Sequence, residues 1–323
     1  SLVRAMLPDM PIHVSTQASV TSARSAEAYL RLGCRRVVLA RELTLDEIIA
    51  LRRDCSREME LEVFVHGSMC VAYSGRCLLS NYLTGRDANR GECAQPCRWN
   101  YRVRYLEFEE QKRPGMFIPA EENEFGTFVM SSRDLCMIRH IPELCRAGID
   151  SLKIEGRMKS EYYAAVTANA YRIALDSFAA SPDDYVFDER LWDEVESVSH
   201  REYDTGFFFG PPSQDANVCD TLSYIREKAY LAVAEKPVPP PEPIRKSMQD
   251  GLTLYRFTQR NKFKLGDTIA VISPGRTGRE FKAEALFDSE GNPIESTPHP
   301  LMEFWLGVPF DVKEGDILRG QQI

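Results

Sequence analysis

The sequence predicts an α/β protein in two parts: a strand–helix alternation over residues 1–234 and an all-β domain over residues 246–323. Three observations support this prediction. Short apolar runs alternate with stretches of helical periodicity in the first part. The segment EKPVPPPEPIR at 235–245 is Pro-rich and should form an extended linker. After this linker, helical periodicity almost disappears.

The first part should contain parallel strands joined by crossover helices. Strands are expected at 11–17, 35–43, 61–70 and 149–156. Helices are expected at 22–33, 44–55, 132–148 and 160–178. Thr44 and Glu47 have capping-box spacing at the start of the second helix, and Ser132 is the expected cap of the third. Such an alternation indicates parallel strands.

Four parallel strands cannot close a barrel, whereas eight can. The chain begins abruptly at Ser1, without Met, and soon enters strand-like sequence. Both facts fit a (β/α)8 TIM-type barrel that lacks its N-terminal half. The alternative is a small open α/β sheet.

A large insertion, about 67–132, interrupts the alternation. Its first part is Cys-rich, and residues 101–132 alternate in the manner of antiparallel β, with turn signals at Pro114-Gly115 and around Gly126. The C-terminal domain twice places Gly-Asp before an apolar strand, at 264–275 and 313–320. This repetition predicts a small antiparallel β-barrel or sandwich, with a role in packing or substrate docking.

Composition limits the possible partners and the compartment. The chain has 323 residues, of which 43% are hydrophobic and 27% charged, and its net charge is -8. Non-specific nucleic-acid binding is disfavoured, because phosphate contacts need Lys and Arg. A specific RNA could still use a local basic cluster formed by Arg86, Arg90, Arg98, Arg102 and Arg104. With no apolar run of membrane length and no secretion signal, a cytoplasmic protein is expected.

Nine cysteines in such a protein suggest metal ligands, redox groups or core residues rather than disulfides. Core packing is the expectation for Cys34, Cys55, Cys145 and Cys219. Four others lie in one polar, Gly-rich stretch that cannot build an apolar core: Cys70, Cys77, Cys93 and Cys97. Their irregular spacing ranks an iron–sulfur cluster only slightly above zinc, and a nucleophilic cysteine would need a histidine nearby.

The stretch EVFVHGSMCVAYSGRCLLS (62–80) closely resembles the signature of the collagenase-like peptidase family thirty-two, of unassigned catalytic type. SLKIEGRMKS (151–160) and SHREYDTGFFFG (199–210) also resemble that family, the latter its tRNA-hydroxylation (TrhP-type) branch. The resemblance covers nearly the whole chain. It favours the half barrel, and it implies that the other half found in related proteins is either missing here or supplied by a partner chain.

The resemblance also implies a function. The family carries an old protease label, but its better-understood members hydroxylate RNA bases or ubiquinone precursors without O2 and contain a [4Fe–4S] cluster. The tRNA branch makes 5-hydroxyuridine at the wobble position, with prephenate as the oxygen source. Carried over to this chain, the cluster ligands are Cys70, Cys77, Cys97 and Cys136, with Cys93 as an alternative to Cys97.

In a barrel of this type, chemistry takes place at the carboxyl ends of the strands. The residues expected there in catalytic roles are His66, Glu155, Lys153 and Glu42. Those expected to bind substrate are His13, Gln17, Arg41 and Arg157, together with Arg98 from the insertion. Cations on this face suit a dicarboxylate such as prephenate or an RNA phosphate. The structural alternative is a set of satisfied salt bridges.

Two other functions stay open. Proteolysis is the second hypothesis, although the sequence has no nucleophile elbow, no H-E-x-x-H motif and no Cys–His–Asn order. The third hypothesis is a non-catalytic half that needs a partner chain. Tyr73, Tyr82, Trp99 and Tyr101 lie among the arginines and could stack on an RNA base or simply pack the insertion.

Overall fold

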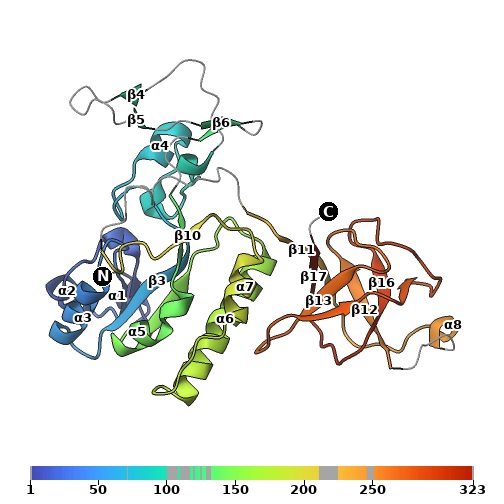
Figure 1. The fold of residues 1–323 in the computed structure, drawn as a ribbon. Helices are drawn as coiled ribbons and strands as arrows, with labels where there is room; N and C mark the ends of the chain where they lie inside the picture. Colours follow the sequence, from blue (N-terminus) through green and yellow to red (C-terminus); the bar gives the residue numbers. More distant parts are fainter. Residues whose placement is uncertain are drawn as a thin grey trace. The chain divides into compact units, whose positions relative to one another are not determined.

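The computed structural model describes residues 2–70, 72–99, 132–210, 225–245 and 251–321, and between them the backbone of four short strands. The chain divides into two compact units (Figure 1). Unit 1 comprises residues 1–155 and 200–224, and unit 2 comprises residues 156–199 and 225–323. Within the described residues, no helix is both long and apolar enough to cross a membrane.

The central sheet of unit 1 confirms the four predicted parallel strands. These strands are β1 (His13–Val14), β2 (Arg36–Val38), β3 (Glu60–Ser68) and β9 (Ser151–Ile154). They pair in parallel in the order β1-β2-β3-β9. The connecting helices are α2 (Ala23–Arg31) and α3 (Leu45–Asp54), and Thr44 and Glu47 form the predicted capping box at the start of α3.

The two faces of this sheet differ in polarity because side chains alternate along a strand. Val37, Leu61 and Val63 are buried, and Val63 lies beside Ile48 of α3. On the same strands, Arg36 and Glu62 alternate with these apolar residues. The helices therefore cover the apolar face, and the other face is charged.

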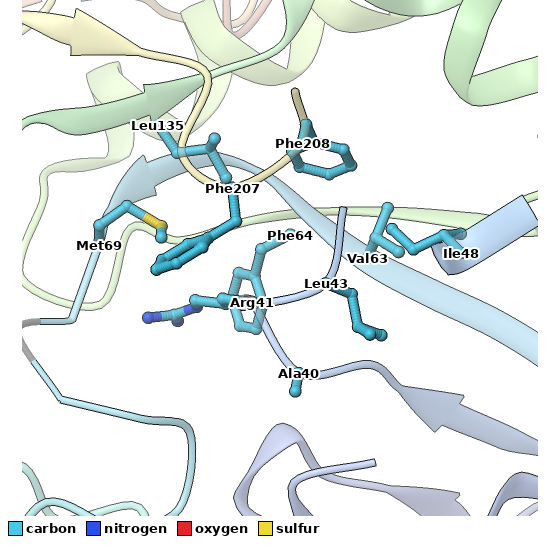
Figure 2. A pocket seen from close by; sticks show the side chains of 10 residues that line it. All are labelled: Ala40, Arg41, Leu43, Ile48, Val63, Phe64, Met69, Leu135, Phe207 and Phe208. Carbon is cyan, nitrogen blue, oxygen red and sulfur yellow. The ribbon is translucent and has the colours of Figure 1, made fainter. Parts of the chain in front are cut away.

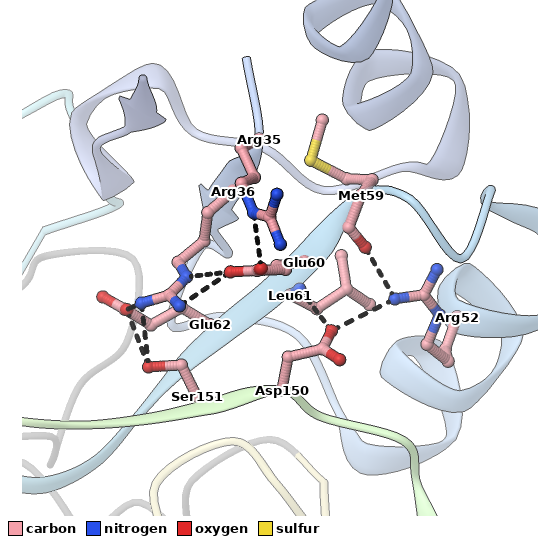
Figure 3. A network of polar contacts seen from close by, with 9 residues as sticks. All are labelled: Arg35, Arg36, Arg52, Met59, Glu60, Leu61, Glu62, Asp150 and Ser151. Atoms are coloured by element: carbon pink, nitrogen blue, oxygen red, sulfur yellow. Dashed lines mark hydrogen bonds and ion pairs between the residues drawn. The ribbon is translucent and has the colours of Figure 1, made fainter. Parts of the chain in front are cut away.

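An interaction between α3 and the start of β9 holds the sheet in register. The buried guanidinium of Arg52 donates to the Met59 carbonyl at 2.8 Å and lies 3.3 Å from the Asp150 carboxylate (Figure 3). Asp150 in turn accepts from the backbone N–H of Leu61 at 2.8 Å. The segment that enters β9 is thus attached both to β3 and to α3.

The prediction of one helix over 132–148 is wrong in its first half. Asp134–Cys136 forms strand β8, antiparallel to the end of β3 and parallel to β10 (Tyr203–Asp204). A short 3-10 turn at Ile138–His140 follows, and only then α5 (Ile141–Arg146). Ser132 does not cap a helix, because its hydroxyl donates to the Met69 carbonyl. Strand pairing with two distant segments outweighs the local helical pattern.

The remaining elements of unit 1 are short. The described helices are α1 (Leu2–Met6), α4 (Leu79–Thr84) and 3-10 turns at Thr16–Ala18, Ala88–Arg90 and Pro96–Arg98. The insertion contains two antiparallel pairs, β4 (Phe108–Glu109) with β5 (Phe117–Ile118) and β6 (Glu121–Asn123) with β7 (Gly126–Phe128). These pairs confirm antiparallel β there, while the predicted Pro114-Gly115 turn lies outside the described residues.

Unit 2 contains a seven-stranded antiparallel sheet in the order β14-β13-β17-β11-β12-β16-β15. The strands are β11 (Lys228–Ala234), β12 (Thr253–Gln259), β13 (Thr268–Ile272), β14 (Arg279–Lys282), β15 (Leu286–Asp288), β16 (Glu303–Val308) and β17 (Ile317–Gln321). One core, including Leu231, Phe257 and Phe304, takes residues from all seven strands, so the sheet curls around it. Both Gly-Asp turns precede a strand as predicted, at β13 and β17.

Two helices from the middle of the chain belong to unit 2, namely α6 (Glu161–Ala180) and α7 (Arg190–Glu196). The buried guanidinium of Arg319 on β17 binds the Glu194 carboxylate of α7 through two hydrogen bonds of 2.6 and 2.8 Å. Asn169 of α6 donates to the carbonyls of Ser273 and Arg276. The Pro-rich segment with α8 (Glu242–Arg245) lies inside unit 2, so the compact units do not divide at this segment.

Candidate functional site

The carboxyl end of β3 is the point where the sheet of unit 1 changes partners. His66 pairs with Ile154 of β9 on one side and with Cys136 of β8 on the other. The next residue, Gly67, has a φ of +101°. A Cβ at this position would lie 2.2 Å from the carbonyl oxygen of Glu155. Only glycine allows β3 and the exit of β9 to come this close.

Three aromatic rings lie together at this point, two of them stacked and the third, His66, tilted by 55° against Tyr203. The His66 side chain is 1% exposed, and its Nε2 lies 3.4 Å from the hydroxyl of Tyr203 on β10. Tyr203 stacks on His200, with ring centroids 4.4 Å apart and an interplanar angle of 8°. A buried imidazole beside a phenol can exchange a proton with it. Residues 199–210 were used only for the resemblance, so the sequence analysis missed both His200 and Tyr203.

The hydrogen bonds of His200 identify its tautomer. Nδ1 lies 2.6 Å from the carbonyl oxygen of Arg201, and a carbonyl can only accept, so Nδ1 carries the hydrogen. The other ring nitrogen, Nε2, is buried, and within the described part of the chain no group hydrogen-bonds to it. The backbone N–H of Arg201 donates to Asp134 of β8, which ties this segment to the sheet.

Arg41, predicted to bind substrate, lies in the loop after β2. Its guanidinium carbon is 3.9 Å from the centre of the Phe64 ring, and Nη1 donates to the Cys70 sulfur at 3.0 Å. Figure 2 shows Arg41 beside Phe64 and Phe207, at the edge of an apolar void of about 10 Å³. This void is about the size of one water molecule and too small for a substrate. Arg41 therefore orients the start of the cysteine segment.

Glu42 has a structural role in this arrangement. Its carboxylate accepts the backbone N–H of Ser74 at 2.6 Å, and the hydroxyl of Ser74 accepts the backbone N–H of Arg41 at 3.3 Å. Gly75 approaches Gln17 so closely that a Cβ would lie 2.2 Å from the Gln17 carbonyl oxygen. Residues 74 and 75 are thus attached to the loops after β1 and β2. The structure brings Gln17, Arg41, Glu42 and Cys70 into one region, as predicted.

Lys153, predicted to be catalytic, belongs to a charged ladder on the face of the sheet opposite α3. Its Nζ donates to Glu62 at 3.0 Å, and Glu62 also accepts from Ser151 at 2.9 Å and from Arg36 at 3.0 Å. Arg36 continues the ladder to Glu60 at 2.7 Å (Figure 3). Burial alone would raise the pKa of Glu62, but the hydrogen bonds from Lys153 and Ser151 outweigh it, so the pKa lies below its ordinary value. Here the structure realises the alternative of satisfied salt bridges.

The cysteines provide thiols of the right kind but not a ready metal site. None of the eight described cysteines is in a disulfide; Cys70 is exposed, Cys136 is buried, and Cys77, Cys93 and Cys97 are half-buried. Cys93 accepts a hydrogen bond from the backbone N–H of Gln95. Within the described residues, no group of three or more His, Cys, Asp or Glu side chains could hold a single metal ion. A four-cysteine cluster binds each thiolate to a different iron, so the cluster stays a prediction.

Of the other predicted site residues, His13 lies away from this region. His13 is exposed and lies in register with Arg36 at the amino end of the sheet, so its placement at a strand exit is wrong. Arg157 belongs to unit 2. Arg98 lies in the 3-10 turn Pro96–Arg98, and its side chain is outside the described part of the structure. Glu155 does lie at the site, where its backbone N–H donates to the His66 carbonyl at 2.8 Å.

Comparisons with known proteins agree with this picture. Peptidase family U32 matches residues 1–217, and the Peptidase family U32 C-terminal domain matches residues 244–319. The tRNA hydroxylation protein P of Escherichia coli (strain K12) is 34% identical, over 97% of this chain and 73% of its own length. The tRNA hydroxylation protein P1 of Bacillus subtilis (strain 168) is 34% identical, over 92% of this chain and 66% of its own length.

A further relative is the 23S rRNA 5-hydroxycytidine C2501 synthase of Escherichia coli (strain K12), which is 36% identical over 53% of this chain and 24% of its own length. The two family matches together cover both the strand–helix part and the curled sheet. The chain spans about two thirds to three quarters of the tRNA hydroxylation proteins named above. With its signature at the end of β3 and its C-terminal domain both matched, this chain belongs to peptidase family U32.

Proposed function

We propose that this chain hydroxylates a tRNA base, converting wobble uridine to 5-hydroxyuridine. The observation that carries the proposal is the relationship to tRNA hydroxylation protein P over 97% of the chain. A relative named for hydroxylating a base of 23S rRNA supports the reaction class. Since the substrate would be tRNA, we also propose a cytoplasmic protein.

The residues at the end of β3 suit this chemistry. Replacing the C5 hydrogen of uridine by a hydroxyl group removes a proton from the base. The Tyr203 hydroxyl and the His66 imidazole, 3.4 Å apart, form a partly buried pair that can accept and pass on such a proton. Arg41 supplies a cation beside the cysteine segment, where an anionic oxygen donor could bind.

An oxygen donor and a redox group are also required, and both come from the family resemblance. We propose prephenate as the donor, and a [4Fe–4S] cluster held by Cys70, Cys77, Cys97 and Cys136, with Cys93 as the alternative to Cys97. The cluster would supply electron transfer. We assign no reaction step to the cluster.

The sheet supports a fold proposal as well. Four adjacent parallel strands in chain order, with helices on one face and charges on the other, support the proposal of half a (β/α)8 barrel. We propose that another segment or a partner chain completes this barrel by pairing with its outer strands, which would enclose the charged face. In a complete barrel, Glu62 and Lys153 would point inward.

The test measures nucleosides. The chain is expressed in an Escherichia coli strain without its own tRNA hydroxylation proteins, and digested tRNA is analysed by mass spectrometry for 5-hydroxyuridine. We expect the modification to appear, and Tyr203→Phe to lower its rate about tenfold or more through loss of the proton path. Tyr255→Phe, on β12 in unit 2, is the matched control. Unmodified tRNA in the presence of folded chain, or cleavage of collagen peptides instead, contradicts the proposal.

A separate measurement tests the cluster. Anaerobically purified protein should contain about four irons and four sulfides per chain, and Cys97→Ala should lose them. Cys34→Ala changes a thiol outside the cysteine segment and should retain them. Zinc, or neither iron nor sulfide, would return the peptidase label to consideration.

A further inference from the structure

Unit 2 contains an open cavity of about 520 Å³ that is lined by charged side chains. Its walls come from the amino-terminal end of α6, the first residues of β11 and the loop after β12. The side chains that define its character are Lys159, Arg226, Lys228, Lys262, Tyr162 and Tyr230. All of them belong to unit 2, so the cavity is complete within this unit.

The cavity is strongly basic in an acidic protein. Four cationic side chains line it, and no Asp or Glu does, although the whole chain has a net charge of -8. In the part of the chain that the structure describes, Arg226, Lys228 and Lys262 form no ion pair. Two acids adjoin lining residues in the chain: Glu227 lies between Arg226 and Lys228, and Glu161, which lies 3.9 Å from Arg260, precedes Tyr162. Cations that the protein does not neutralise itself are available to an anionic ligand.

Aromatic rings lie among these cations. Tyr162 and Tyr230 stack with centroids 5.7 Å apart and an interplanar angle of 10°. Tyr162 is buried and shares a hydrogen bond with Ser197, so it forms a fixed floor under Tyr230. The guanidinium of Arg260 lies 5.9 Å from the centre of the Tyr230 ring. Flat rings beside cations can contact sugars and bases while the cations bind phosphates.

We propose that this cavity binds the sugar–phosphate backbone of RNA. A site for a small molecule is usually enclosed and mostly apolar, whereas this cavity has several exposed lining residues, including Met158, Arg226 and Lys262. Its cations are spread over a helix end, a strand and a loop, which suits successive phosphates better than a single anion. The inference rests on the proposed function, since it gives the tRNA substrate a second contact in unit 2.

The test compares two charge reversals of equal size. Lys228→Glu/Lys262→Glu changes the cavity, and Lys282→Glu/Lys313→Glu changes two exposed lysines of unit 2 that do not line it. Binding of fluorescently labelled tRNA to the full chain is measured by anisotropy between about 50 and 200 mM salt. Circular dichroism checks that both variants are folded.

We expect the cavity variant to bind tRNA at least about tenfold more weakly, with the slope of log affinity against log salt reduced by about two, one for each lost phosphate contact. The control pair should stay within about twofold of the wild type. Equal losses in both variants, unchanged binding in the cavity variant, or wild-type binding to anionic vesicles but not to tRNA would each overturn the inference.

These outcomes are independent of the nucleoside assay. If the wild type makes 5-hydroxyuridine while the cavity variant binds tRNA normally, the cavity inference fails and the proposed function stands. If tRNA binding depends on the cavity but no base is hydroxylated, the cavity inference stands and the proposed function fails.

Discussion

Replacing Gly67 with alanine should destabilise unit 1, because the residue has no room for a side chain. The new Cβ would lie 2.2 Å from the Glu155 carbonyl oxygen and 3.0 Å from its carbonyl carbon. To reach even 3.0 Å, this oxygen has to move by about 0.8 Å. It cannot move freely, because the N–H of Glu155 donates to the His66 carbonyl at 2.8 Å.

The magnitude follows from three effects. A non-glycine residue at positive φ costs about 1–2 kcal/mol. Overpacking against a backbone that can yield only partly costs about 1–3 kcal/mol. Weakening the hydrogen bond between Glu155 and His66 costs about 1 kcal/mol. We therefore expect the free energy of unfolding of unit 1 to fall by about 3–6 kcal/mol.

Gly85 provides the matched control. It also has a positive φ, +69°, but nothing lies within 4 Å of the position of its Cβ. Gly85→Ala should therefore show only the conformational cost, about 1–2 kcal/mol. Urea unfolding followed by circular dichroism, with hydrogen exchange of the β3 amides to locate the effect, measures both variants. Equal destabilisation of the two would refute the argument that Gly67 is required by close approach.

Three further predictions concern stability. Glu62→Gln should lower the free energy of unfolding by about 1–2 kcal/mol at neutral pH, because it weakens the bonds to Lys153 and Arg36. Since the pKa of Glu62 is lowered in the folded state, this stability difference from wild type should hold above about pH 4.5 and shrink as pH falls through the folded pKa. A stability difference in urea unfolding that stays constant with pH would contradict this prediction. Arg319→Met should destabilise unit 2 by about 3–5 kcal/mol, because Glu194 stays buried without its cation, and Arg319→Met/Glu194→Met should recover part of the loss. Thr44→Ala should cost about 1 kcal/mol in thermal unfolding by removing the cap of α3, and no change would contradict the capping role.

Local patterns were sufficient for the regular elements. The capping box at Thr44, the parallel strands 11–17 to 149–156 and the Gly-Asp turns before β13 and β17 all follow from short-range chemistry. The segment 132–148 shows where this fails. Its apolar spacing is compatible with a helix, but Asp134–Cys136 pairs with strands more than 60 residues away in sequence.

The candidate site shows the same division. The sequence predicted that His66, Arg41, Glu42, Gln17 and Cys70 would meet, because the ends of parallel strands share one edge. It could not predict that the ammonium group of Lys153 would bind the Glu62 carboxylate, since that contact depends on the register of β3 against β9. It also missed the stacking of Tyr203 and His200, which depends on β10 returning to pair with β8.

The sequence by itself determined the family signature, the α/β alternation and the concentration of thiols, because these depend on residue type and spacing alone. Only the tertiary structure decided that α6 and α7 belong with the curled sheet, and that a basic cavity forms at the amino-terminal end of α6. Each of these depends on which distant side chains come within a few ångströms. No local pattern encodes that distance, because it is fixed by the packing of the whole unit.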